Sequence, residues 1–211
     1  MPTSRMEAFS DGVIAILITV MVLELKVPHG TTWDALHESL PTLLTYVLSF
    51  VYLGIYWTNH HHMLMASGQV NGLVLWTNLH LLFWLSLIPF TTGWMGENHF
   101  AAAPVAAYGI TLLGAALAYY ALQTAIIRVQ GPGSRLATAV GGDLKGKLSP
   151  LLYAAAIGLT FTARWVSVGL YVVVALIWLV PDRRVERTIT ATRPRSEPVQ
   201  QPLDDGAGGA E

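Results

Sequence analysis

The chain has no cysteine and few charged residues. Without cysteine it has neither disulfides nor thiolate metal sites. Charged residues make up 12% of its 211 residues, against roughly 25% in soluble domains. The net charge of −1 leaves no strongly basic surface, so no nucleic-acid partner is expected. The sequence also lacks Gly-x-Ser-x-Gly, His-Glu-x-x-His and phosphate-loop motifs, so we do not expect an enzyme.

What the chain has in abundance is apolar residues, which make up 53% of the sequence at a mean hydropathy of +0.49. A helix needs roughly 20 apolar residues to cross a bilayer. The pattern predicts an all-α, polytopic membrane protein with one six-helix transmembrane domain over residues 1–181. The tail 182–211 is rich in Thr, Pro, Gln and Gly, which predicts a disordered cytoplasmic segment. The expected spans are residues 8–25, 40–60, 70–92, 100–127, 148–163 and 165–180.

The last two spans come from one long apolar stretch with Arg164 at its middle. A single helix of that length would measure about 50 Å and would place the arginine near the bilayer midplane. Two short spans joined at Arg164 fit better, and six spans put both termini on one side. Most cations then share that side, which predicts an N-in, C-in topology in the cell membrane.

The first span has charged residues close to its apolar run, because Arg5 and Asp11 precede it and Glu24 follows it. Helical spacing predicts one face that bears Arg5, Phe9, Gly12, Ile16, Thr19 and Leu23. Ser10 and Asp11 point elsewhere, toward other helices. The face is either a packing seam or the lining of a pore, in which hydrophobic constrictions gate ions. Periodicity alone does not choose between the two.

Polar residues also close the second span, where Trp57 is followed by Asn59 and by the run His60–His62. In the predicted topology this end meets Asp11 at one depth, so Asp11 is expected to accept a hydrogen bond from a histidine. Arg5 is expected to pair with an acid or a carbonyl. Neighbouring helical residues lie about 100° apart, so three consecutive histidines do not converge on one metal. A structural network is the favoured interpretation, with proton sensing as an alternative because histidine titrates near neutral pH.

The third span carries two polar residues among Leu, Phe and Trp. Asn78 is expected to face the bundle and form hydrogen bonds between helices. His80 is expected to be a satisfied interior histidine rather than a ligand.

Three motifs in order resemble the transmembrane protein 175 family of potassium-permeable channels, over about the first hundred residues. The first is Arg-x-x-x-Phe-Ser-Asp at residues 5–11. The second is Trp-x-x-His-His at 57–61. The third combines Asn78-Leu79 with the segment 87–92, Leu-Ile-Pro-Phe-Thr-Thr. The resemblance implies six helices per repeat and four single-repeat chains around one pore lined by the first helix.

By offset from Asp11, the resemblance places the narrow aliphatic layers at Ile16, Val20 and Leu23, with Thr19 at a hydroxyl layer. Val20 is smaller than the family's usual residue, which implies looser selectivity. The expected partners are further copies of the chain, potassium ions and lipid, with no cofactor and no metal besides permeating potassium. The residues of the implied network between helices are Arg5, Phe9, Ser10, Asp11, Trp57, His60, His61 and Asn78.

Two other hypotheses remain open from the sequence. A proton-coupled transporter would use Asp11 and His60–His62. The broken helices and inverted repeats of transporters are not evident in the sequence. A lipid-binding or structural membrane protein would carry no flux at all.

Overall fold

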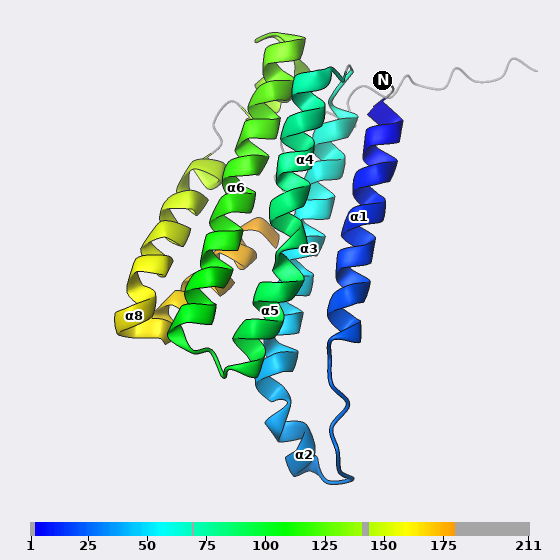
Figure 1. Cartoon of the computed structure of the whole chain (residues 1–211). Coiled ribbons are helices and arrows are strands. Elements are labelled where there is room, and N and C mark those ends of the chain that lie inside the picture. Colours follow the sequence, from blue (N-terminus) through cyan, green and yellow to red (C-terminus); the bar gives the residue numbers. More distant parts are fainter. Residues whose placement is uncertain (1–2, 69, 141–143, 180–211) are drawn as a thin grey trace, which may run out of the picture.

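The computed structural model describes residues 3–68, 70–140 and 144–179, and within these ranges the regular structure is entirely helical (Figure 1). The predicted all-α fold is confirmed. The predicted tail 182–211 lies outside the described residues. In chain order the helices are α1 (Thr3–Leu23), α2 (Trp33–Glu38), α3 (Leu40–Met65), α4 (Gly72–Ser86), α5 (Ile88–Glu97), α6 (Ala102–Gln130), α7 (Arg135–Val140) and α8 (Leu144–Leu179).

Five helical segments of the described chain are long and apolar enough to cross a membrane, so the protein is a multi-pass membrane protein. The first four overlap the first four predicted spans, and the fifth covers both 148–163 and 165–180; most extend past the predicted ends. The second, for example, continues through the polar histidine run to Met65, because hydrogen-bonded helix persists beyond the apolar stretch. The segments are Thr3–Leu23, Leu40–Met65, Gly72–Glu97, Ala102–Gln130 and Lys145–Leu179.

The third span runs past its predicted end at residue 92. α4 ends at Ser86, and after Leu87 the chain continues as α5 to Glu97. Pro89 lies in the first turn of α5, where a missing backbone N–H breaks no helical hydrogen bond. The proline therefore starts a second helical segment of the same span instead of ending it.

The last helical segment, α8, is interrupted at Ala163, where the backbone is non-helical (φ −146°, ψ 63°). Contacts between its two ends show that the arms lie side by side. Lys145 Nζ donates to the Ile177 carbonyl at 3.1 Å, and Trp178 Nε1 donates to Ser149 Oγ at 2.7 Å. The yellow and orange arms of Figure 1 accordingly run in opposite directions. The interruption adjoins Arg164, where the sequence predicts the join.

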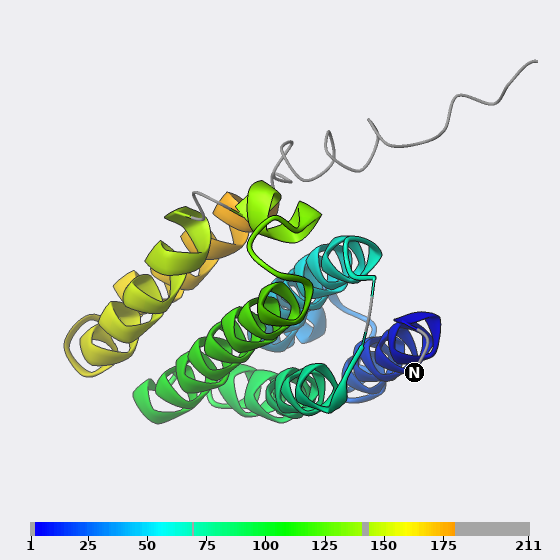
Figure 2. The ribbon, with the colours of Figure 1, turned by 90° about the horizontal axis from the view of Figure 1, so that it is seen from above.

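The centre of the bundle is α6, which packs against α4, α5 and α8. Seen along the bundle, α1 lies at the opposite edge from α8 (Figure 2). α3 and α4 lie on either side of α1. Two glycines let neighbours approach the α6 backbone, a common device in membrane helices. The Trp84 ring of α4 covers Gly114, and the Tyr171 hydroxyl of α8 covers Gly109.

We expect Gly114→Ala to lower the free energy of unfolding by about 1–3 kcal/mol, the usual cost of overpacking. A Cβ at this position would collide with the indole of Trp84. Gly169→Ala is the matched control, because no described atom lies within 4 Å of its added Cβ. Thermal unfolding in detergent compares the two variants, and equal melting temperatures would contradict the prediction.

Candidate functional site

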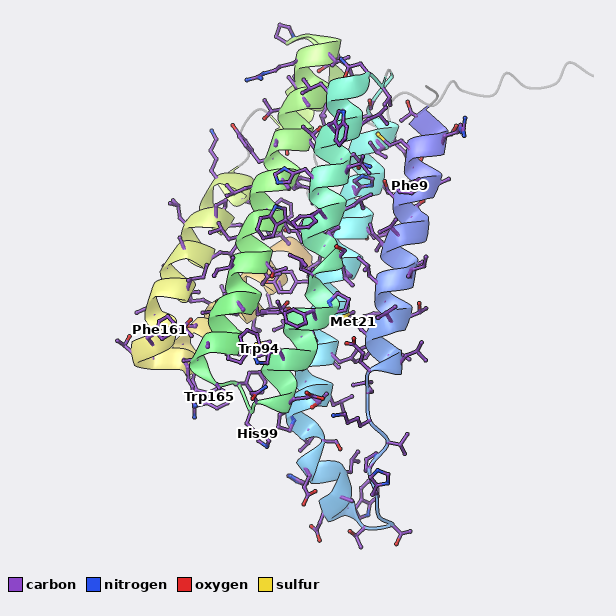
Figure 3. The ribbon with its side chains drawn as sticks, in the orientation of Figure 1. Phe9, Met21, Trp94, His99, Phe161 and Trp165 are labelled. Atoms are coloured by element: carbon purple, nitrogen blue, oxygen red, sulfur yellow. The ribbon has the colours of Figure 1, made fainter. Side chains whose placement is uncertain are left out.

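The first helix, α1, has one buried side and one open side. Its buried side chains recur every three or four residues, as on a helix that packs along one stripe. They pack toward α3, α4 and α5, while the rest of the helix is left uncovered by the subunit (Figure 2). In Figure 3, Phe9 lies in the upper part of α1 and Met21 lies near its lower end. The buried residues are Met6, Ser10, Ile14, Leu17 and Met21.

The residues predicted to line a pore are all on the open side of α1. Ile16 is 61% exposed and Leu23 is 82% exposed. Thr19 and Val20 are exposed between them, and Phe9 is exposed on the same side. An apolar surface of this kind in a membrane protein faces lipid, another subunit or a pore.

Thr19 has a defined hydrogen-bonding role on this surface. Its hydroxyl donates to the Ile16 carbonyl at 2.8 Å, within the helix. A hydroxyl has one proton and two lone pairs, so this bond leaves the exposed Thr19 oxygen as an acceptor. It presents to the open side the kind of oxygen that a cation prefers.

A buried chain of hydrogen bonds joins the other side of α1 to α4 and α3. Ser10 Oγ donates to the Met6 carbonyl at 2.9 Å. Asn78 Nδ2 donates to Ser10 Oγ at 3.0 Å. Asn78 Oδ1 lies 2.7 Å from His60 Nε2, and because an amide oxygen only accepts, His60 donates from Nε2. Asn78 therefore faces the bundle, as predicted, and connects three helices.

The opposite ring nitrogen, His60 Nδ1, is buried without a hydrogen-bond partner among the residues that the structure describes. With the proton on Nε2, Nδ1 of neutral imidazole has only a lone pair. The geometry thus uses His60 as a single-bond donor to Asn78, a role in helix packing.

A second pair of contacts joins α1 directly to α3 at the same end of the two helices. Trp57 Nε1 donates to Asp11 Oδ1 at 3.0 Å, and His61 Nδ1 lies 2.7 Å from Glu7 Oε1. The rings of Trp57 and His61 are stacked, with centroids 6.4 Å apart. Each helix contributes two residues spaced i, i+4, so both pairs form at once along the α1–α3 contact.

These contacts correct three sequence-based expectations. The donor to Asp11 is Trp57, not a histidine, because the indole lies level with the acid and the imidazole lies one turn away. Glu7, which the sequence analysis missed, takes the histidine; its i, i+4 spacing from Asp11 was the available signal. The Arg5 side chain makes no hydrogen bond or ion pair with the described residues, and His80 is exposed rather than interior.

We expect Trp57→Phe to lower the free energy of unfolding by about 1 kcal/mol, the net value of a typical hydrogen bond. The variant keeps an aromatic ring beside His61 and removes only the donor to Asp11. Trp33→Phe is the control, since the Trp33 indole is 83% exposed and makes no hydrogen bond within the described chain. A melting temperature of Trp57→Phe equal to that of the control would show that the Asp11 contact contributes nothing.

Fold and site together define a multi-pass helical membrane protein whose N-terminal helix is held on one side by polar contacts and is open on the other. Residues 5–89 match the family described as "Endosomal/lysosomal potassium channel TMEM175". A potassium channel of Chryseobacterium is 51% identical over 189 residues, covering 90% of this chain and 98% of that protein. The chain belongs to the TMEM175 family, and the resemblance noted in the sequence is confirmed.

Two further relatives extend over most of the chain. A potassium channel of Streptomyces collinus is 32% identical over 195 residues, covering 83% of this chain and 91% of that protein. The crystal structure of a lysosomal potassium-selective channel TMEM175 homologue from Chamaesiphon minutus superposes with a TM-score of 0.76 at 28% identity. It covers 85% of this chain and 97% of that one. The likeness therefore includes the α6–α8 half, which the sequence motifs did not reach.

Proposed function

We propose that this protein is a potassium-permeable cation channel of the cell membrane, built from four copies of the chain with the open faces of α1 around a common axis. The observation that carries the proposal is the two-sidedness of α1. Its buried side is held by Ser10 and Asn78, and its open side bears Ile16, Thr19 and Leu23. The similarity to potassium channels over nearly the full chain supports it.

In this assembly Ile16 and Leu23 form two hydrophobic rings about 10 Å apart along the axis, since a helix rises about 1.5 Å per residue. Narrow hydrophobic rings exclude water and close a pore by dewetting. Thr19 lies between them and offers hydroxyl oxygens that replace part of the hydration shell of potassium. Val20 flanks the rings with a smaller side chain, which favours a modest preference for potassium over sodium.

The proposed topology has six passes, with both termini in the cytoplasm. The break at Ala163 lets α8 cross the membrane twice. Arg128, Lys145 and Lys147 then lie on the cytoplasmic side, while Lys26 and Arg164 lie outside, in accord with the positive-inside rule. Lys26 is paired with Glu97 at 2.6 Å on that outer side.

A proton-coupled transporter would instead use Asp11 and His60–His62. Three of these groups already have contacts that join helices within the subunit. Asp11 binds Trp57, His60 binds Asn78 and His61 binds Glu7. These contacts favour a structural role for the cluster, so the channel is the better-supported function.

Reconstitution of the purified chain under a potassium gradient tests the proposal. The channel predicts discrete current steps in a planar bilayer and potassium flux that does not saturate. A transporter predicts slow, saturable uptake that stops in Asp11→Asn, and a structural protein gives silence; either result would overturn the channel. Native mass spectrometry counts the subunits, and any number other than four would refute the assembly.

A further inference from the structure

One flank of the subunit presents a ridge of large side chains along α4 and α5. The ridge residues recur at steps of three, four or seven, which places them on one side of the span. Phe83 is 56% exposed and Trp76 is 74% exposed, so the subunit itself leaves them uncovered. We call this surface the α4–α5 ridge: Leu73, Trp76, His80, Phe83, Phe90 and Trp94.

The flank on the other side of α1 is concave. A groove of about 460 Å³ runs along α3, with Ile18 of α1 on one rim and Trp178 of α8 on the other. Its floor includes Gly54, and no described atom lies within 4 Å of a Cβ added there. Glycine inside a helix costs about 1 kcal/mol relative to alanine, and packing within the subunit does not require it. The groove thus has a notch that something outside the subunit can occupy.

His80 is the polar member of the otherwise apolar ridge. Its Nε2 accepts a hydrogen bond from Trp84 Nε1 at 3.0 Å, so the proton of the neutral ring is on Nδ1 and available to donate. Lipid tails offer no acceptor for it. The groove offers an acceptor, because Asn59 lines it. Asn59 Nδ2 donates to the Ile55 carbonyl, which leaves the side-chain amide oxygen free to accept.

Ridge and groove also lie at matching depths. His60 contacts Asn78 at 2.7 Å, and Ser49 contacts Thr92 at 2.6 Å. These contacts align α3 with the antiparallel α4–α5 span at two heights. Along that alignment His80 is level with the turn that holds Asn59, and Phe83 is level with the turns near Gly54. Rotation about an axis along the membrane normal preserves depth, so the same levels meet between neighbouring subunits.

We infer that the α4–α5 ridge of each subunit packs into the α3 groove of the next, with Phe83 in the Gly54 notch and His80 donating to Asn59. The occupant of the groove is a second copy of this chain. The two surfaces differ, so the contact is head-to-tail and closes into a ring with α1 innermost. This inference rests on the proposed four-fold assembly, and it specifies which surfaces build it.

Cross-linking tests the contact, because the chain has no native cysteine. Gly54→Cys combined with Phe83→Cys is expected to give, on mild oxidation or with a short bifunctional thiol reagent, a ladder of linked species ending at the tetramer. The control combines Gly54→Cys with Leu117→Cys, whose exposed side chain lies on α6. Links in the control but not in the Gly54–Phe83 pair would overturn the inference.

Subunit counting by native mass spectrometry separates this inference from the proposed function. A tetramer without Gly54–Phe83 links overturns the ridge-and-groove contact and leaves the channel assembly standing, whereas a monomer overturns both. A variant without cysteine gives a second readout. Gly54→Phe fills the notch and is expected to shift most of the protein to smaller species, while Phe83→Leu keeps an apolar knob and retains tetramers. Full tetramer in Gly54→Phe would contradict the inference.

Discussion

Ile16→Asn is expected to raise potassium leak through reconstituted channels at least about tenfold, which corresponds to a barrier lower by about 1.4 kcal/mol. Ile16 is largely exposed on the open side of α1, and in the proposed assembly four copies form one dewetted ring. An amide in place of each aliphatic side chain hydrates that ring, so water and ions remain in the constriction.

Two matched variants make the Ile16 experiment specific. Ile16→Leu keeps an apolar ring and is expected to conduct like the native protein. Val22→Asn places the same amide on the same helix, on an exposed strip beside the predicted face. Potassium flux into liposomes that contain a fluorescent indicator dye is measured for all three variants. Unchanged leak in Ile16→Asn would exclude Ile16 from the gate, and equal leak in Val22→Asn would show that any amide on α1 has the same effect.

Asn78→Leu is expected to lower the free energy of unfolding by about 1–3 kcal/mol and to abolish conduction. The side chain is buried between His60 and Ser10 and bonds both. Leucine has a similar size but satisfies neither. A buried polar group left without a partner costs about 1–3 kcal/mol, and hydrogen bonds within membrane proteins fall toward the low end. Asn78 connects α4 to both α1 and α3. Without it, the proposed pore helix α1 is no longer held in one orientation, so conduction is lost.

Thr77→Val is the control for this experiment. Thr77 is the chain neighbour of Asn78, and its hydroxyl bonds only carbonyls of its own helix, those of Leu73 and Val74. It is expected to keep native stability and flux. Thermal unfolding in detergent and liposome flux give the two readouts. If the melting temperatures of Asn78→Leu and Thr77→Val agree within experimental error, the buried chain of hydrogen bonds is dispensable.

Local periodicity explains why the arrangement of α1 could be predicted. Residues three and four apart share one side of any α-helix, so spacing alone grouped Ile16, Thr19 and Leu23 and turned Ser10 toward the bundle. The structure agrees, since Ser10 is buried and the other three are exposed. The spans were predictable for a related reason, because the thickness of the bilayer sets the length of an apolar helix.

The partners of the polar groups were not predictable in the same way. Trp57 and a histidine are both plausible donors to Asp11, and they are about one helical turn apart on α3. Which of them donates depends on the height of α3 relative to α1. That offset depends on how two helices pack, which no single helix encodes. His80 illustrates the same limit: its polarity suggested an interior site, but the rotation of α4 against α6 places it outside.

The sequence by itself determined the all-helical membrane fold, the positions of the spans and the two sides of α1, because each follows from the composition or periodicity of one continuous segment. Only the tertiary structure decided that Asn78 joins Ser10 to His60, that Glu7 takes His61, and that Trp57 is the donor to Asp11. Those features depend on the height and rotation of one helix relative to another. Many side-chain contacts distributed over the whole bundle determine that height and rotation together.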